Sequence, residues 1–301
     1  MTVPSTTRPS TDRRRARRRS SGTGRIAPTI VLIVAAVFFL APLLTLSRYA
    51  LQNVPTIRLG WSTLFDKWSL SGLTKAFSED DFWTSLKLSL QLAVGTVMLT
   101  LLMLLPTAIW VHLRLPKARA FVEFLTLLPF MIPAIALVAG IVIVKPHARW
   151  FLNSDYALIP FYMVLALSFT YRAIDAGLRA IDLRTMVDAS RSLGAGWGTT
   201  LRRVLIPNLR ISILSASFLT AAVVIGEYTI ANVLLKKTLP AFQAEFTGKE
   251  PQAGYGLNLL ALLVTILLFV ILSLLTRPRK SPRRPFLSTA ATAAPAAETL
   301  P

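Results

Sequence analysis

Cysteine is absent from this 301-residue chain, and histidine occurs only at His112 and His147. The absence of cysteine excludes disulfide bonds and thiolate chemistry, and zinc sites that combine Cys and His ligands lack their donors. Neither histidine has a second metal-binding residue type close by, so we interpret both as interface residues. The nucleotide-binding pattern Gly-x-x-x-x-Gly-Lys-Ser/Thr is missing, and no nucleophile–base arrangement is recognisable. We therefore expect neither an enzyme nor a metal site.

Acidic residues are scarce: 14 Asp and Glu accompany 33 Lys and Arg, which gives a net charge of +19. That balance is compatible with nucleic acid binding, but eleven of the excess charges lie in the two tails, 1–25 and 276–301. Neither tail offers the folded basic surface with base-reading groups that nucleic acid recognition requires. Basic tails beside apolar runs fit attraction to anionic lipid headgroups instead. We expect contact with membrane lipid and no nucleic acid partner.

Long apolar runs are plentiful, and hydrophobic residues make up 53% of the chain. A helix needs about 20 apolar residues to cross a bilayer. Pro129 and Pro133 predict a kink in the third run, and Glu123 is expected to stabilise the N-terminus of that helix. We predict an all-α membrane protein with six transmembrane helices. The expected spans are Ile26–Ser47, Thr84–Val111, Phe121–Val144, Tyr156–Tyr171 (ending near Arg172), Asn208–Leu235 and Leu257–Thr276.

The distribution of basic residues orients these spans. Of the Lys and Arg residues, 23 lie on one side of the six spans and 9 on the other, and cytoplasmic segments are enriched in both residue types. We therefore predict that both termini are cytoplasmic. The predicted organisation is a disordered basic tail over 1–25, a first span with an external loop over 26–83, a membrane core over 84–276 and a second disordered tail over 277–301.

A polar segment with three glycines lies between the fourth and fifth spans, and the charge distribution places it in the cytoplasm. Asp182 is a suitable N-cap for a short helix, and the glycines at 194, 196 and 198 allow a tight turn. Apolar residues beyond that helix recur at helical spacing: Leu193, Trp197, Leu201 and Val204. This pattern predicts an amphipathic hairpin. On these residues alone, packing on its own bundle or on lipid explains it as well as docking to a partner.

Within this segment, Asp188, Ala189 and Ser190 are followed by Gly194, and after nine intervening residues come Val204, Ile206 and Pro207. The spacing resembles the EAA loop of bacterial ABC-importer permeases: Glu-Ala-Ala, three residues, Gly, nine residues, Ile-x-Leu-Pro. The resemblance extends over about residues 84–275, and the Leu128–Gly140 segment is also similar to the family. The chain departs from the pattern at Asp188, one methylene shorter than Glu, and at Ser190, which adds a hydroxyl group where close packing is expected.

This resemblance implies a membrane subunit that forms the solute pathway of an ATP-driven importer in the bacterial cell membrane. In the family, the loop is a coupling helix that lies in a groove of the ATPase. The implied coupling residues are Asp188, Ala189, Ser190, Gly194, Trp197, Leu201, Arg202, Val204, Ile206 and Pro207. The implied partners are an ABC ATPase dimer, a second permease subunit and an external solute-binding protein. The ATPase would bind ATP and Mg, and this chain is expected to bind no cofactor.

Glu227 is the acidic residue that stands out within an apolar run, and an intramembrane carboxylate is a functional hypothesis by default. It lies 19 residues beyond Asn208, which is about 28 Å along a continuous helix and near the outer leaflet. The surrounding Gly-Glu-Tyr and Thr-Ile-Ala resemble a segment of polyamine-type permeases. We therefore take Glu227, Tyr228 and Asn232 as candidate residues of the translocation pathway. A structurally paired carboxylate explains Glu227 equally well, and helix packing is the simpler role for the other two.

The same segment implies a polyamine such as spermidine or putrescine as the solute. Permeases for iron(III), thiamine, sulfate or molybdate, and phosphonate are related, and they stay open as alternatives. The alternative class is a protein that works without an ATPase, either a secondary transporter or a membrane scaffold. A secondary transporter should show inverted repeats or paired intramembrane charges, and the sequence indicates neither.

Overall fold

The computed structural model describes residues 26–52 and 68–275. The tails predicted over 1–25 and 277–301, and residues 53–67 of the predicted external loop, lie outside the described residues. The described part is helical, apart from an isolated bridge between Gln52 and Trp68. The helices are α1 (Ile26–Leu51), α2 (Ser71–Ser78), α3 (Asp80–Arg114), α4 (Arg119–Met131), α5 (Ala134–Val144), α6 (Arg149–Leu152), α7 (Leu158–Arg179), α8 (Leu183–Ser192), α9 (Trp197–Thr200), α10 (Ile206–Gly226), α11 (Thr229–Val233), α12 (Leu239–Lys249) and α13 (Pro251–Leu275).

Five stretches of helix are long and apolar enough to cross a membrane: Pro28–Leu51, Asp80–Arg114, Asp155–Arg179, Arg210–Val233 and Pro251–Leu274. The sixth is the bent pair α4 and α5, whose axes differ by 82°. With that pair taken as one span, the predicted six-span all-α fold is confirmed. The third span is not a single kinked helix, because Pro133 disfavours the helical conformation at the preceding residue. Ile132 is accordingly extended, with φ −86° and ψ 125°.

The centre of the bundle is formed by α3, α7 and α10. Helices α7 and α10 approach closely at Gly177, where a Cβ atom would collide with the side chain of Ser212. Farther along, the hydroxyl groups of Thr170 and Thr220 form a buried hydrogen bond of 2.6 Å between the two helices. Small residues thus let α7 and α10 approach closely, as small residues do in membrane bundles.

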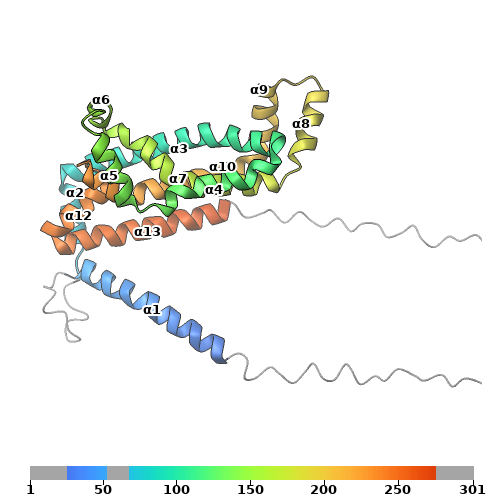
Figure 1. The fold of residues 1–301 in the computed structure, drawn as a ribbon. Coiled ribbons are helices and arrows are strands. Elements are labelled where there is room, and N and C mark those ends of the chain that lie inside the picture. Colours follow the sequence, from blue (N-terminus) through green and yellow to red (C-terminus); the bar gives the residue numbers. More distant parts are fainter. Residues whose placement is uncertain (1–25, 53–67, 276–301) are drawn as a thin grey trace, which may run out of the picture.

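The ends of the bundle differ (Figure 1). Helices α8 and α9 project at one end, and α2, α6 and α12 lie at the other. The beginning of α1 and the end of α13 point toward the end that carries α8 and α9. Helix α1 packs mainly against α13, with Tyr49 and Tyr255 in edge contact at 4.9 Å between ring centroids. Most of the apolar surface of α1 remains exposed, as for a helix that faces lipid.

Candidate functional site

The segment between α7 and α10 is a hairpin with its own local structure, which we call the coupling hairpin (residues 182–207). It begins where the carboxylate of Asp182 accepts hydrogen bonds from the backbone N–H and the hydroxyl group of Thr185, at 3.3 and 2.7 Å. The predicted N-cap at Asp182 is therefore confirmed. Helix α8 then runs for ten residues to Ser192.

Helix α8 ends in a turn that requires glycine. The N–H of Gly194 donates to the carbonyl oxygen of Arg191 at 2.9 Å, and the N–H of Ala195 donates to that of Ser190 at 3.2 Å. This pair of bonds is the Schellman motif, in which the residue after the C-cap takes a left-handed conformation. Gly194 has φ +81° and is the one glycine among the described residues with a positive φ. The left-handed backbone conformation of the turn thus explains why the family pattern has glycine at this position.

The second limb leads into the membrane. Helix α9 continues through a π-helical turn, Leu201–Leu205, into α10. Pro207 lies in the first turn of α10, a part of a helix that tolerates proline. The side-chain amide of Asn208 donates to the carbonyl oxygen of Val204 at 2.7 Å and so satisfies part of the irregular turn. Single π-helical turns are frequently found at functional positions.

The predicted coupling residues divide into two groups. One group is packed inside the hairpin or against the bundle: Ser190, Leu201 and Val204. The other group is exposed: Asp188, Ala189, Gly194, Trp197, Arg202, Ile206 and Pro207. Leu193 at the tip is 88% exposed, and the guanidinium group of Arg191 lies over the ring of Trp197 at 5.6 Å from its centroid. The free surface of the hairpin is therefore its tip and the outer side of its limbs.

The two departures from the family pattern have different surroundings. The hydroxyl group of Ser190 forms a buried hydrogen bond of 3.0 Å with the hydroxyl group of Thr200, and this bond joins the two limbs. The extra polar atom at Ser190 therefore has a partner inside the packed hairpin. Asp188 is exposed and makes no ion pair with any residue of the ranges 26–52 and 68–275. Its shorter side chain thus leaves the internal packing of the hairpin unchanged.

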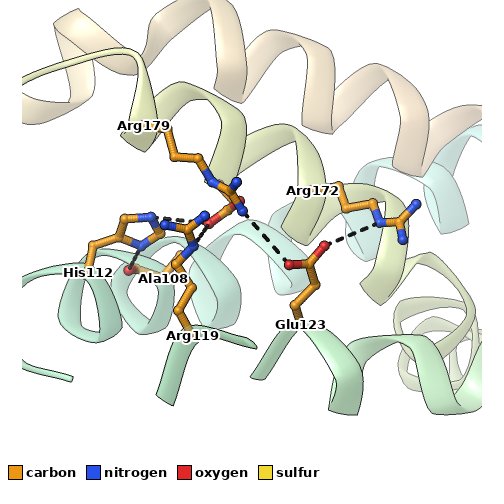
Figure 2. Close-up of polar contacts among 7 residues, drawn as sticks. Ala108, His112, Arg119, Glu123, Arg172 and Arg179 are labelled. Atoms are coloured by element: carbon orange, nitrogen blue, oxygen red, sulfur yellow. Dashed lines mark hydrogen bonds and ion pairs between the residues drawn. The ribbon is translucent and has the colours of Figure 1, made fainter. Parts of the chain in front are cut away.

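A cluster of ionisable residues from α3, α4 and α7 precedes the hairpin, and we call it the Asp175 cluster (His112, Arg119, Glu123, Arg172, Asp175 and Arg179). Figure 2 labels all of its members except Asp175. Oδ1 of Asp175 lies 3.1 Å from Nε2 of His112 and 3.0 Å from Nε of Arg119. Arg179, one turn along α7, contacts Oδ2. The other ring nitrogen of His112 lies 2.9 Å from the carbonyl oxygen of Ala108. A single buried carboxylate thus joins three helices.

Glu123 belongs to the same cluster but is held more loosely. Its carboxylate oxygens lie 3.8 Å from Arg172 and 3.8 Å from Arg179. The side chain is 34% exposed, against 7% for Asp175. Glu123 is the fifth residue of α4, beyond the first turn, so the predicted stabilisation of that helix N-terminus is wrong. The residue contacts two arginines of α7 instead.

Asp175 was missed in the sequence because the fourth span was expected to end near Arg172. Helix α7 in fact continues to Arg179. Tyr171, Ile174 and Leu178 are buried along with Asp175, and their spacing follows one face of a helix. That continued spacing was the signal that could have extended the predicted span. The candidate span Asp155–Arg179 therefore holds an acidic residue paired with arginines, contrary to the sequence-based expectation.

Glu227 lies at a break in the fifth span, not within a continuous helix. Helix α10 ends at Gly226, Glu227 is extended, and α11 starts at Thr229. The Glu227 carboxylate accepts hydrogen bonds from the backbone N–H groups of Ile230 at 2.9 Å and Ala231 at 3.4 Å. The buried carboxylate thus has hydrogen-bond donors at the start of a helix, and the N-terminus of a helix favours negative charge.

The residues after this break line a pocket at the end of the bundle opposite the hairpin. Its volume is about 440 Å³, and Tyr228 and Asn232 contribute to its wall along with Ser85 from α3. Each charged residue of its wall has a partner. Lys237 pairs with Asp81 at 3.1 Å within the wall, and residues outside the wall pair with the other two, as Asp155 with Lys236 and Lys249 with Glu245. We call this the outer pocket, for its place at the end of the bundle away from the hairpin. Glu227 does not line it but fixes the helix that does.

No three His, Cys, Asp or Glu residues in the described part of the chain are arranged to hold a metal ion.

Comparison with known proteins gives three findings. Residues 104–277 match the family described as binding-protein-dependent transport system inner membrane component. The sulfate transport system permease protein CysW of Synechocystis is 27% identical, and the match covers 81% of this chain and 91% of that protein. The fold is similar to a chain in the crystal structure of a bacterial ABC transporter involved in importing the acidic polysaccharide alginate. That likeness has a TM-score of 0.63 at 16% identity and covers 82% of this chain and 94% of the other.

Proposed function

Because this chain belongs to the family of inner-membrane components of binding-protein-dependent transport systems, we propose that its coupling hairpin is the surface through which a separate ATPase drives transport. The chain is a non-catalytic, multi-span membrane subunit of an ABC importer. The family assignment, rather than an absence of paired charges, separates it from a secondary transporter. The proposal concerns which residues of this chain make the connection.

The observation that carries the proposal is the hairpin itself. Its interior is fixed by a capped helix, a Schellman turn and a buried hydroxyl pair, yet Leu193 and Trp197 at its tip are exposed on the surface of the chain. A rigid element with an exposed apolar tip is suited to transmitting rigid-body movement of an attached partner. The partner is an ABC ATPase dimer that binds ATP and Mg, while this chain binds no cofactor. The hairpin and both chain termini lie in the cytoplasm of the bacterial cell.

At the opposite end, the outer pocket is the solute entrance of this subunit. Tyr228 and Asn232 face the pocket, and Glu227 acts on the pathway indirectly by holding α11 in place. A second permease subunit completes the pathway, and an external solute-binding protein delivers the solute. These assignments agree with the positions of the hairpin and of α12, which lines the pocket, at opposite ends of the bundle (Figure 1).

The solute we propose is a small oxyanion such as sulfate. A sulfate permease is among the similar proteins, whereas the polyamine expectation finds no support in the comparisons. A polyamine also needs carboxylates that are free to bind it. The Glu227 carboxylate is occupied by backbone N–H groups, and that of Asp175 is occupied by His112 and two arginines. Iron(III), thiamine, molybdate and phosphonate are the remaining alternatives.

Trp197→Ala tests the docking role. The tagged chain is purified with its ATPase, and both the co-purified ATPase and solute uptake are measured. We expect Trp197→Ala to lower both, and deletion of 194–198 to abolish them. Trp150→Ala is a matched control, because this tryptophan is 84% exposed at the other end of the bundle; it should retain the ATPase. Full ATPase association in the deletion variant would reject the hairpin as the docking surface.

The solute is tested with labelled sulfate and a panel of competitors. Uptake in cells that express the complete importer should be competed by unlabelled sulfate and not by spermidine or putrescine. Uptake of a labelled polyamine, with no sulfate uptake, would restore the polyamine assignment. Competition by molybdate, phosphonate, thiamine or iron(III) identifies the alternatives.

A further inference from the structure

The Asp175 cluster lies where the coupling hairpin joins the bundle, and it ties together helices that are otherwise held by apolar packing. Arg119 is the first residue of α4, and His112 lies two residues before the end of α3. Asp175 is on the last turns of α7, and three residues separate that helix from α8. The cluster is therefore the polar connection between the start of α4 and the element that leads into the hairpin.

The hairpin and the end of α7 form one packed unit. Leu183 and Val187 of α8 and Leu205 of the π-helical turn share a buried cluster with Ile174 and Leu178 of α7. Ile174 is the direct neighbour of Asp175. Because closely packed interiors transmit displacement rather than absorb it, a movement of the hairpin reaches the Asp175 carboxylate.

Helices α4, α5 and α11 connect the Asp175 cluster to the outer pocket. Helix α4 packs chiefly on α7 and then turns through the 82° bend into α5. Helix α5 packs on α11, whose Asn232 lines the outer pocket. The bent pair α4–α5 thus spans the distance between the two ends of the bundle, with Asp175 at one end and α11 at the other.

We propose that Asp175 is a positioning residue that makes α4 and α5 move with the coupling hairpin, so that movement driven by the ATPase reaches the outer pocket. The inference rests on the docking role proposed for the hairpin. Apolar side chains alone allow a helix to slide along its neighbour, whereas a carboxylate held by Arg119 and His112 at 3.0 and 3.1 Å fixes one register. Buried ionic groups that specify one arrangement are a known use of such pairs.

Glu123 supplies an internal control within the same cluster. It also connects α4 to α7, but its contacts are 3.8 Å long and its side chain is one-third exposed. Exposed ion pairs at this distance contribute little. Removing its charge should therefore leave α4 attached to α7 and transport almost unchanged.

The test uses the complete importer, with the chain bound to its ATPase, in lipid nanodiscs. Because the chain has no cysteine, spin labels can be attached without background at Trp83→Cys on α3 and Ile143→Cys on α5. Both positions are exposed, at 56% and 75%. Distances between the labels are measured with and without ATP, and the solute transported per ATP hydrolysed is measured on unlabelled samples.

We expect ATP to shift the label distance in the parent importer. Asp175→Asn should remove most of that shift and lower transport per ATP at least tenfold while the ATPase stays bound. Asp175→Glu should restore both in part, and Glu123→Gln should match the parent. A purely structural role would lower the yield of folded protein but leave the shift and the transport ratio of the folded fraction intact; that result overturns the proposal.

If Asp175→Asn does not fold, Arg119→Gln and His112→Gln test the same connection by removing one partner at a time. Each should reduce the ATP-dependent shift, and a parent-sized shift in both variants rejects the positioning role. A parent importer that binds ATP but shows no label shift also overturns it. Retention of the ATPase after deletion of 194–198 would reject the docking proposal alone, so the failures of the two proposals are distinguishable.

Discussion

Asp175 and Glu227 are two buried carboxylates in the membrane part of one chain, and their charges are balanced by different means. Asp175 is contacted by the ring of His112 on α3 and by the guanidinium groups of Arg119 on α4 and Arg179 on its own helix α7. Glu227 accepts hydrogen bonds from backbone N–H groups three and four residues ahead of it. The contacts of Asp175 therefore depend on the assembled bundle, whereas the backbone hydrogen bonds of Glu227 depend on the local course of the chain. The coupling hairpin repeats the contrast, with a local turn at Gly194 and a contact between limbs at Ser190.

The largest expected effect comes from removing the carboxylate that depends on the bundle. Asp175→Ala leaves His112 and Arg119 without their partner, and we expect it to lower the free energy of unfolding by about 3 kcal/mol, the low end for broken buried pairs. The low end applies because Arg179, the third partner of Asp175, is half exposed, so water can solvate its charge when the carboxylate is removed. Denaturation of the purified chain in detergent micelles checks this. Glu123→Ala is the control and should change the same quantity by less than about 1 kcal/mol; equal losses would contradict the difference between the two sites.

Removing the locally balanced carboxylate should have a smaller effect. Glu227→Leu leaves the N–H groups of Ile230 and Ala231 without acceptors, which we expect to lower the free energy of unfolding by about 2 kcal/mol. Glu227→Gln keeps one carbonyl oxygen for Ile230 and should lose less. Denaturation measures the stability, and the KM of solute uptake reports on the outer pocket. Parent-like uptake by Glu227→Gln would remove Glu227 from the transport pathway and leave it a purely structural cap.

The turn of the hairpin comes next. Gly194 and Gly196 both have open space where a Cβ atom would be added, but only Gly194 has a positive φ. Gly194→Ala should therefore destabilise the hairpin by about 1 kcal/mol through backbone strain and reduce the amount of ATPase that co-purifies. Gly196→Ala adds the same methyl group at a residue without a positive φ, so this variant should behave as the parent. If both variants lost the ATPase equally, the side chain itself and not the turn would be responsible.

The smallest effect is expected between the limbs. Ser190→Ala removes the hydrogen bond to Thr200 and restores the alanine of the family pattern, so we expect a loss of only about 0.5 kcal/mol. Thr200→Val is its partner variant, and the double variant should lose less than the sum of the two. A double-mutant cycle on the free energy of unfolding measures this coupling. Strict additivity would show that the two hydroxyl groups do not stabilise each other.

These contrasts also explain which features could be predicted from the sequence. The hairpin was predictable because its determinants are local: a capping Asp182, a glycine at the turn and a proline at the start of α10. Glu227 was noticed because it interrupts an apolar run, although its role as a cap for α11 depends on a helix break that periodicity did not indicate. The bend at Ile132 was predicted only as a kink, because a proline predicts an interruption without fixing its angle.

The amino-acid sequence by itself determined the membrane class, the number of spans and the position of the hairpin, because these follow from apolar length, charge placement and turn chemistry along the chain. Only the tertiary structure decided which residues meet. Asp175 and Arg179 are one turn apart on α7, but no spacing in the sequence relates them to His112 on α3 or to Arg119 on α4. The split of the hairpin into an exposed tip and a buried hydroxyl pair was likewise decided by packing. Contacts between helices depend on how their faces are assembled, and that information is spread over the whole bundle.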